Sequence, residues 1–371
     1  MNFSFTKQQK MLKKSVNHFL SRECPEIAKE AESTDEGFFR DSWKKIAGLG
    51  WLGVGIPDEF GGIGGDILDL VIVLEEMGYF LFPGPYIQTI ACSGIVMSEF
   101  GTNKQKETYL PGISAGDIIF APALEKPQTM QDEIGPDENI RRDATSFQLT
   151  GTRFLIPYGK SADYFLYSGE DSDHKAVLFV VDAKVKGVDI TSLDTIGSDR
   201  QCEVSLKDVH LTKDDIFGNR DHAGRIIQKI RQMGALSESA YLSGMLKRIL
   251  DMTVEYAKQR EQFGRPIGGF QIIQHQLADM FIMIEQVQNL TYHAAWKISA
   301  GESSEKEISM AKARASDAAR FVSLMGVKIH GGIGIIDEYD MQHYFRRAKA
   351  REFSFGDADA HREMVADALG L

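Results

Sequence analysis

The feature that most constrains the fold of this chain is a regular spacing of apolar residues in its C-terminal part. The spacings are four, three, four and three residues, in Ile273, Leu277, Met280, Ile284 and Val287. A run of this kind forms the buried stripe of a long amphipathic helix in a bundle. With the further helical runs on either side, it predicts a C-terminal four-helix bundle over residues 221–371.

The sequence also marks where these helices end and begin. Gly301 ends the first run, because glycine is a poor helix former. Ser304 stands three residues before Glu307, which is the spacing of a capping box. We therefore expect the Ser304 side chain to cap the next helix.

The rest of the chain divides into a helical part and a β part. Residues 1–115 show helical periodicity interrupted by glycine-rich turns. Residues 116–220 contain short runs rich in β-branched and aromatic residues. With 371 residues, the chain also exceeds what one hydrophobic core usually serves. We predict an α+β multidomain protein with an N-terminal helical domain (1–115), a central β-barrel-like domain (116–220) and the C-terminal four-helix bundle (221–371).

The charge balance and the apolar runs argue against two classes of partner. The chain has 42 basic and 53 acidic side chains, and its formal net charge of −11 disfavours nucleic acid and anionic membranes. No apolar run approaches the ~20 residues that span a bilayer, and the N-terminus lacks the apolar core of a signal peptide. We expect a cytoplasmic protein.

The three cysteines indicate neither a disulfide framework nor a metal site. Cys24, Cys92 and Cys202 lie far apart and lack the spacing of metal ligands. We expect them to be reduced thiols.

The segment from Tyr256 to Met280 indicates a site for an anionic group. It joins two long predicted helices through Gly264 and Pro266, and it places Arg260 at the end of the first helix. A guanidinium there can bind a phosphate through two parallel hydrogen bonds, so a pyrophosphate cofactor is the natural ligand. Taken alone, Arg-x-x-Phe-Gly also fits an ordinary helix hairpin with a solvated arginine.

Three motifs in this order resemble those of the acyl-CoA dehydrogenase family of flavoproteins. They are Ile56-Pro57-Asp58-Glu59-Phe60-Gly61-Gly62, Arg260-Glu261-Gln262-Phe263-Gly264 with Gln271, and Lys328-Ile329-His330-Gly331-Gly332-Ile333-Gly334. The likeness covers nearly the whole chain. The resemblance implies FAD as cofactor and α,β-desaturation of an acyl-CoA thioester, with a carboxylate as the base that removes the proton next to the thioester carbonyl. It also implies an electron-transfer flavoprotein as electron acceptor and a tetrameric assembly.

The resemblance assigns the cofactor-binding residues by position. In the family, the arginine motif and the later glycines reach a flavin that is held mainly by a neighbouring subunit. The expected cofactor-binding residues are Arg260, Phe263, Gln271, Gly331, Gly332 and Gly334. For the glycine pair the alternative is a plain helix-ending turn. Lys328 replaces the glutamine usual in the family, and it either serves a phosphate or is solvated.

The central domain departs from the family pattern. The family usually carries Thr-Glu-Pro-x-x-Gly-Ser-Asp and Trp-Ile-Thr segments that hold the flavin ring. The corresponding residues here are 121–130 and Phe154-Leu155-Ile156-Pro157-Tyr158. Neither matches, and Pro157 lacks the amide proton of a backbone hydrogen bond. We expect this chain to bind its own flavin weakly or through other contacts.

Neither usual position of the catalytic base carries a carboxylate, so the catalytic residue is unknown. By position, the two family locations fall on Gly356 and Gly234. Nearby substitutes are Asp357, Asp359 and Glu238. For the two aspartates the alternative is a capped, solvated start to the last helix, whose apolar face would include Met364, Val365 and Leu369.

Residues 355–363 resemble one branch of the family, the heteromeric bacterial enzymes that act on steroid side-chain, cyclic or aromatic acyl groups. In that branch two related subunits pair, and one of them lacks the base. The first hypothesis is therefore a base-lacking subunit that pairs with a homologous subunit. The alternatives are a self-sufficient homotetramer with Asp357 as base and a non-catalytic structural relative. The acyl group itself is not predicted, since the aromatic segment 79–100 suits both a bulky acyl group and ordinary helix packing.

Overall fold

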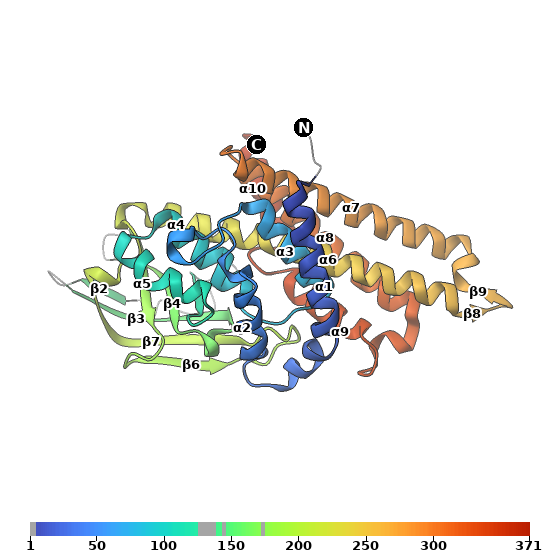
Figure 1. Ribbon diagram of the computed structural model, residues 1–371, viewed down its shortest axis with the longest axis horizontal. Helices are drawn as coiled ribbons and strands as arrows, with labels where there is room; N and C mark the ends of the chain where they lie inside the picture. Colours follow the sequence, from blue (N-terminus) through green and yellow to red (C-terminus); the bar gives the residue numbers. More distant parts are fainter. Residues whose placement is uncertain (1–4, 125–138, 143–145, 172–174) are drawn as a thin grey trace. The chain divides into compact units, whose positions relative to one another are not determined.

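The fold is α+β, and the predicted order of helices, then strands, then helices is confirmed (Figure 1). The structure, a computed structural model, describes residues 5–124, 139–142, 146–171 and 175–371. By contact the chain forms two compact units. The helical unit comprises residues 1–29, 66–82 and 234–371, and the mixed unit comprises residues 30–65 and 83–233. The linear bounds at residues 115 and 220 stay a prediction.

The helical unit consists of seven described helices and one short hairpin, and all the expected cofactor-binding residues lie in it. Its helices are α1 (Lys7–Glu30), α3 (Ile67–Tyr79), most of α6 (Ala223–Gln259), α7 (Gln271–Ser299), α8 (Glu305–His330), α9 (Met341–Arg351) and α10 (Ala358–Ala368). α8 packs against α7, α9 and α10. The alanine-rich face of α8, with Ala311, Ala315 and Ala319 fully buried, permits this close approach.

The apolar stripe on α7 is confirmed in its second half. Met280, Ile284 and Val287 are buried, whereas Ile273 and Leu277 are only half-buried.

The predicted cap of α8 is wrong. Ser304 occupies the N-cap position, but its side chain makes no capping hydrogen bond. The Glu307 carboxylate instead forms an ion pair with Lys297 of α7, with the Nζ and Oε1 atoms 3.0 Å apart. The competing charge explains why the sequence spacing did not form a box.

The mixed unit combines short helices with two β-sheets. Its helices include α2 (Arg40–Gly48), a π-helical segment (Ile87–Gly94), α4 (Ile95–Phe100) and α5 (Asn103–Ser114). One sheet has the order β1-β4-β5, with β1 (Phe120–Ala123), β4 (Tyr164–Glu170) and β5 (Ala176–Asp182). The other has the order β2-β3-β7-β6, with β2 (Asn139–Arg142), β3 (Ser146–Pro157), β7 (Gln201–Thr212) and β6 (Val188–Ser192).

Burial alternates along much of β3 and β7, whereas β1, β4 and β5 are buried almost throughout. β1 and β4 run parallel, and the other described pairs are antiparallel. β3 pairs with β7 in a register that sets Phe147 opposite Leu211, and both side chains are buried. Two irregularities interrupt this register, the second between Arg153 and Ile156. They bend the end of β3, as bulges do.

Two further expectations bear on the location of the chain and on its thiols. The three cysteines are free and buried. Among the described helices, none has both the length and the apolar character required to cross a bilayer.

Candidate functional site

Arg260 lies where α6 meets a short hairpin of β8 (Glu261–Gln262) and β9 (Arg265–Pro266) (Figure 1). The Arg260 amide donates to the Tyr256 carbonyl, and the Ile267 amide donates to the Arg260 carbonyl, both at 2.8 Å. The backbone is therefore fixed on both sides, while the guanidinium is exposed. An arginine held in this way can receive an anionic group.

Phe263 forms the tip of this hairpin. Phe263 and Gly264 have φ values of 53° and 76°, as a two-residue hairpin turn requires. The Phe263 side chain is 93% exposed, and its ring meets Phe270 only edge-on, with the ring centroids 6.1 Å apart. Gln271 and Ile272, at the start of α7, are exposed as well. The helical unit itself therefore leaves this apolar tip uncovered.

Two of the glycines after α8 are favoured for different reasons, one by backbone conformation and the other by packing. Gly331 ends the helix with φ 67° and ψ −145°, a conformation that only glycine adopts readily. Gly334 is favoured by packing, because a Cβ there would lie 3.0 Å from the His330 Cβ and 3.3 Å from the Val327 backbone. A Cβ on Gly332 would meet nothing within 4 Å. The packing of the described residues therefore gives no reason for glycine at 332.

A ring stack joins the hairpin to the glycine turn. Tyr256, one turn before Arg260, stacks on His330, one residue before Gly331, with ring centroids 4.4 Å apart. The His330 Nδ1 lies 2.7 Å from the Gly326 carbonyl, and burial lowers the pKa of His330. The neutral ring therefore donates from Nδ1. Through this stack, Arg260 and the glycine turn are held at one end of the unit.

At the two positions expected for the base, an aromatic ring fills the space beside Gly234, and a left-handed backbone with a close His361 contact restricts Gly356. Gly234 lies in α6, and a Cβ added there would lie 2.3 to 2.6 Å from three atoms of the Phe355 ring. Such distances are far below van der Waals contact, so no side chain fits at 234 while Phe355 stays in place. The adjacent Gly356 has φ 99°, and a Cβ on it would lie 3.0 Å from the His361 Nε2. Local geometry thus requires glycine at both positions.

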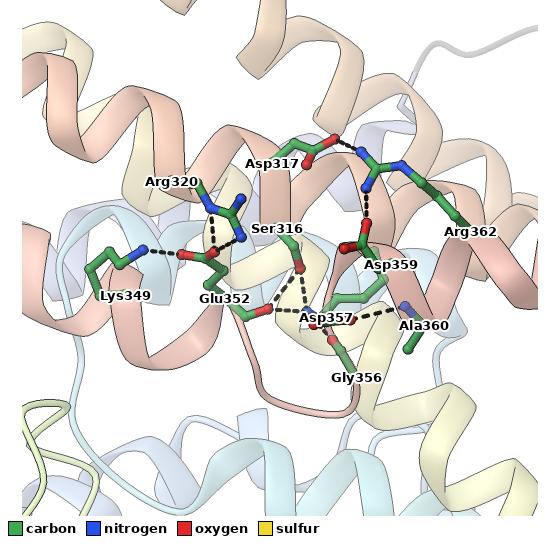
Figure 2. A network of polar contacts seen from close by, with 11 residues as sticks. Ser316, Asp317, Arg320, Lys349, Glu352, Gly356, Asp357, Asp359, Ala360 and Arg362 are labelled. Atoms are coloured by element: carbon green, nitrogen blue, oxygen red, sulfur yellow. Dashed lines mark hydrogen bonds and ion pairs between the residues drawn. The ribbon is translucent and has the colours of Figure 1, made fainter. Parts of the chain in front are cut away.

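The nearby carboxylates are engaged in structural contacts (Figure 2). Asp357 is the N-cap of α10, and its Oδ1 accepts from the Ala360 amide at 2.9 Å. Asp359 is exposed and pairs with Arg362. Glu238 is 2% exposed, and its Oε2 accepts from Arg351 at 2.7 Å. The expected capped start of α10 is therefore present.

The apolar face expected for α10 is wrong. Met364 and Leu369 are 50% and 62% exposed, and Val365 is only half-buried. The buried residues of this helix are Ala358 and His361. His361 is buried in place of the expected apolar residues, and its Nε2 donates to the Phe355 carbonyl at 2.9 Å.

A buried polar network surrounds the turn between α9 and α10 (Figure 2). The Glu352 carboxylate is buried and accepts from Arg320 and Lys349. Lys312 is fully buried and donates to the Ser316 Oγ and to the Glu352 and Gly356 carbonyls, at 2.7, 3.1 and 2.8 Å. Burial lowers the pKa of Lys312 to about 8, although the charges of Glu238, Asp357 and Glu352 oppose that shift.

Apart from Leu155, the residues at the end of β3 pack within the core of the mixed unit. Leu155 has φ 57° and an exposed side chain. Tyr158 is buried, its hydroxyl accepts from the Gly84 amide at 3.1 Å, and its ring meets Phe38 edge-on. The Tyr158 side chain thus fills the interior of this unit. Residues 125–130, on which the other expected departure rests, lie outside the described residues.

A cleft of about 570 Å³ in the helical unit lies among α1, α3, α6 and α9. Arg248, Asp251 and Tyr344 are among its lining residues, and Phe80 from the aromatic segment also lines it. None of the expected cofactor-binding residues borders it.

Comparison with known proteins decides the family. A model of the acyl-CoA dehydrogenase N-terminal domain matches residues 6–117, and a model of the C-terminal domain matches residues 224–370. The acyl-CoA dehydrogenase FadE27 of Mycobacterium tuberculosis is 30% identical over all of this chain and 99% of its own length. The chain belongs to the acyl-CoA dehydrogenase family. It is accordingly a member of a family of FAD-dependent oxidoreductases that act on acyl-CoA.

Two solved structures show how closely the fold of this family member follows its relatives. The ChsE4-ChsE5 complex from Mycobacterium tuberculosis contains a chain with a TM-score of 0.92 and 29% identity, over 100% of this chain and 99% of that one. Butyryl-CoA dehydrogenase from Megasphaera elsdenii has a TM-score of 0.91 and 26% identity, over all of both chains.

The residues of this family member fit a flavin dinucleotide at the hairpin end of the helical unit. Arg260 offers an exposed guanidinium, and Gly332 offers open backbone, since a Cβ there would have no neighbour within 4 Å. Phe263 offers an uncovered ring. Sequence reasoning missed Tyr256, His330 and Lys312 as organising residues. Lys312 gave no signal, because a lysine among alanines in a helix usually points to solvent.

Proposed function

We propose that this chain is the base-lacking subunit of a heteromeric, FAD-dependent acyl-CoA dehydrogenase. The reaction of the assembly is α,β-desaturation of an acyl-CoA thioester, and an electron-transfer flavoprotein accepts the electrons. The acyl group belongs to the steroid side-chain or cyclic class, which the likeness of residues 355–363 supports. A homologous subunit supplies the carboxylate base.

The observation that carries this proposal is the Phe355 ring packed on Gly234. Either position expected for the base could have been rebuilt by one substitution if space were left beside it. Instead the ring fills the space at Gly234, and the turn at Gly356 needs glycine. Asp357, the alternative base, has its Oδ1 engaged by the helix that it caps. These contacts favour a subunit without its own base over a self-sufficient enzyme.

The hairpin end supports a role in a shared flavin site. Exposed apolar side chains occur in the same segments as the cofactor motifs: Phe263, Ile272, Leu324, Ile333, Ile335 and Ile336. Exposed apolar side chains gathered in the same segments favour an interface at this end of the unit. Bound FAD supplies the hydride acceptor. Arg260 would pair with its phosphates, and the backbone at Gly331 and Gly332 would lie against its adenosine end.

The similarity to a chain of the ChsE4-ChsE5 complex, a structure of two different proteins, supports the heteromeric assembly. Departures at Pro157 and Tyr158 support weak binding of a flavin ring by this chain itself. Pro157 has no amide proton, and Tyr158 is committed to the core.

The test is the flavin-to-chain ratio of the protein purified alone and after co-expression with a homologous subunit that carries the glutamate. We expect an isolated chain with little flavin, and a stable complex with bound flavin that acyl-CoA reduces. Arg260→Ala in this chain should then lower the flavin content of the complex.

Two results contradict the proposal. Full flavin occupancy with turnover by the chain alone indicates a self-sufficient enzyme, in which case Asp357→Asn should abolish flavin reduction. A colourless complex under all conditions indicates a structural relative without redox activity.

A further inference from the structure

The Glu352–Gly356 turn is more strongly constrained than a connection between two helices requires. Phe355 has φ 56° and Gly356 has φ 99°, so two successive residues adopt left-handed backbone. For a phenylalanine this conformation is unfavourable, because its Cβ crowds the backbone. The surroundings must therefore hold the turn in place.

Lys312 supplies that restraint from α8. Its ammonium group binds the carbonyls of Glu352 and Gly356, which are the first and last residues of the turn. Ser316, one turn along α8, supplies a third acceptor and itself donates to the Glu352 carbonyl at 2.8 Å. Three acceptors match the three donors of an ammonium group. A methylene chain with no charge would leave both carbonyls without this partner.

His361 holds the middle of the same turn from α10. Its Nε2 donates to the Phe355 carbonyl, so side chains fix three of the five carbonyl groups from Glu352 to Gly356. With its backbone fixed, Phe355 directs its ring against Gly234 of α6.

We propose that Phe355 is a steric plug that closes the Gly234 face of α6, and that Lys312 is the positioning residue that locks this plug. The plug excludes any side chain at position 234 and any ligand group that would lie against it. Identification of the excluded group as the acyl-CoA thioester rests on the proposed function, whereas the closure itself does not. On this basis a carboxylate introduced at 234 alone cannot restore a base, because the space beside it is filled.

The first experiment is a double-mutant cycle on the full chain with Gly234→Ala, Phe355→Ala and the double variant, measured by hydrogen exchange of α6 amides near residue 234. Alone, Gly234→Ala should accelerate this exchange by about tenfold to a hundredfold, the equivalent of the ~1–3 kcal/mol that overpacking usually costs. In the Phe355→Ala background the same change should accelerate exchange by less than about threefold. Equal effects in the two backgrounds overturn the plug.

The second experiment tests Lys312 with Lys312→Met, which keeps the volume and removes the charge. The matched control is Lys306→Met, because Lys306 lies on the same helix, is half-exposed and has its nearest carboxylate at 3.9 Å. Loss of two charge-assisted hydrogen bonds should accelerate exchange of the Gly356 and neighbouring turn amides by at least about tenfold. Amides of α7 and of the β3–β7 sheet should keep their rates.

The location of the amides whose exchange accelerates distinguishes a specific restraint of the turn from a general contribution of Lys312 to stability. Acceleration throughout the helical unit in Lys312→Met, or no acceleration in the turn, overturns the positioning role. Neither experiment depends on flavin, substrate or a partner subunit. Failure of the proposed function therefore leaves both results interpretable.

Discussion

The buried carboxylate of Glu352 offers a sharp test of the network at the turn. In Glu352→Ala, the backbone carbonyl that Lys312 binds is retained, and only the side-chain contacts are lost. Those contacts are two hydrogen bonds from Arg320, at 2.6 and 2.7 Å, and one from Lys349. Charge-assisted hydrogen bonds each contribute about 1.5–3 kcal/mol when buried. The stability lost in Glu352→Ala therefore comes from the ion pairs with Arg320 and Lys349.

The magnitude follows from the exposure of the partners. The Glu352 side chain is 1% exposed, but those of Arg320 and Lys349 are 60% and 29% exposed. After the substitution both cations can regain water, so we count each of the two ion pairs at the lower end, about 1.5 kcal/mol. The expected total loss is therefore about 3 kcal/mol. Unfolding entropy of about 2 cal/mol/K per residue gives about 0.8 kcal/mol/K for a chain of this length. The expected fall in Tm is therefore about 4 °C.

The assay is thermal unfolding followed by circular dichroism, with Asp359→Ala as matched control. Asp359 also pairs with an arginine, Arg362, but its side chain is 86% exposed. Its loss should change stability by less than about 0.5 kcal/mol. A Tm for Glu352→Ala within about 1 °C of the wild type, or equal to that of the control, refutes the reasoning that burial makes these pairs stabilising.

Three further predictions concern the cofactor, the pH and the alternative base. Arg260→Ala should weaken FAD binding by the assembly by about tenfold or more, measured by fluorescence titration; Arg260→Lys should recover only part, and equal affinity in all three would exclude a phosphate contact. Burial lowers the pKa of both His330 and His361 below 6.5, so the unfolded chain binds more protons and stability should fall as the pH drops below 6.5. His361→Gln should reduce that fall in a Tm series from pH 7.5 to 5.5, and an unchanged slope contradicts this assignment. Asp357→Ala should lower stability by about 1 kcal/mol through loss of the helix cap, whereas Asp357→Asn should be nearly neutral. Neither should slow flavin reduction by acyl-CoA in the complex, and a large loss in Asp357→Asn would restore this residue as the base.

Much of the fold could be predicted because it depends on local patterns. The stripe through Met280, Ile284 and Val287 follows from helical periodicity, and strand β3 follows from its β-branched and aromatic residues. The cap at Ser304 could not be predicted in the same way. Lys297, which lies on the preceding helix α7, forms an ion pair with the carboxylate that the box needs. Local spacing cannot show a competitor from another helix.

The candidate site shows the same division between local and distant effects. The absence of a carboxylate at Gly234 and Gly356 is visible in the sequence, but its physical meaning is not. Only the three-dimensional structure shows that Phe355, the neighbour of Gly356 in sequence, packs its ring against Gly234. The stack of Tyr256 on His330 likewise joins segments far apart in the chain, and neither residue type signals a partner.

The uncovered tip of the β8–β9 hairpin also has a consequence for synthesis in the cell. A newly made chain displays Phe263 and its apolar neighbours to water, and in the proposed assembly a partner subunit would cover them. Exposed apolar surface of this kind promotes aggregation and recognition by chaperones and proteases. The yield of soluble protein should therefore rise with the amount of partner made at the same time. For the proposed heteromer, balanced production of the two chains would therefore favour soluble protein.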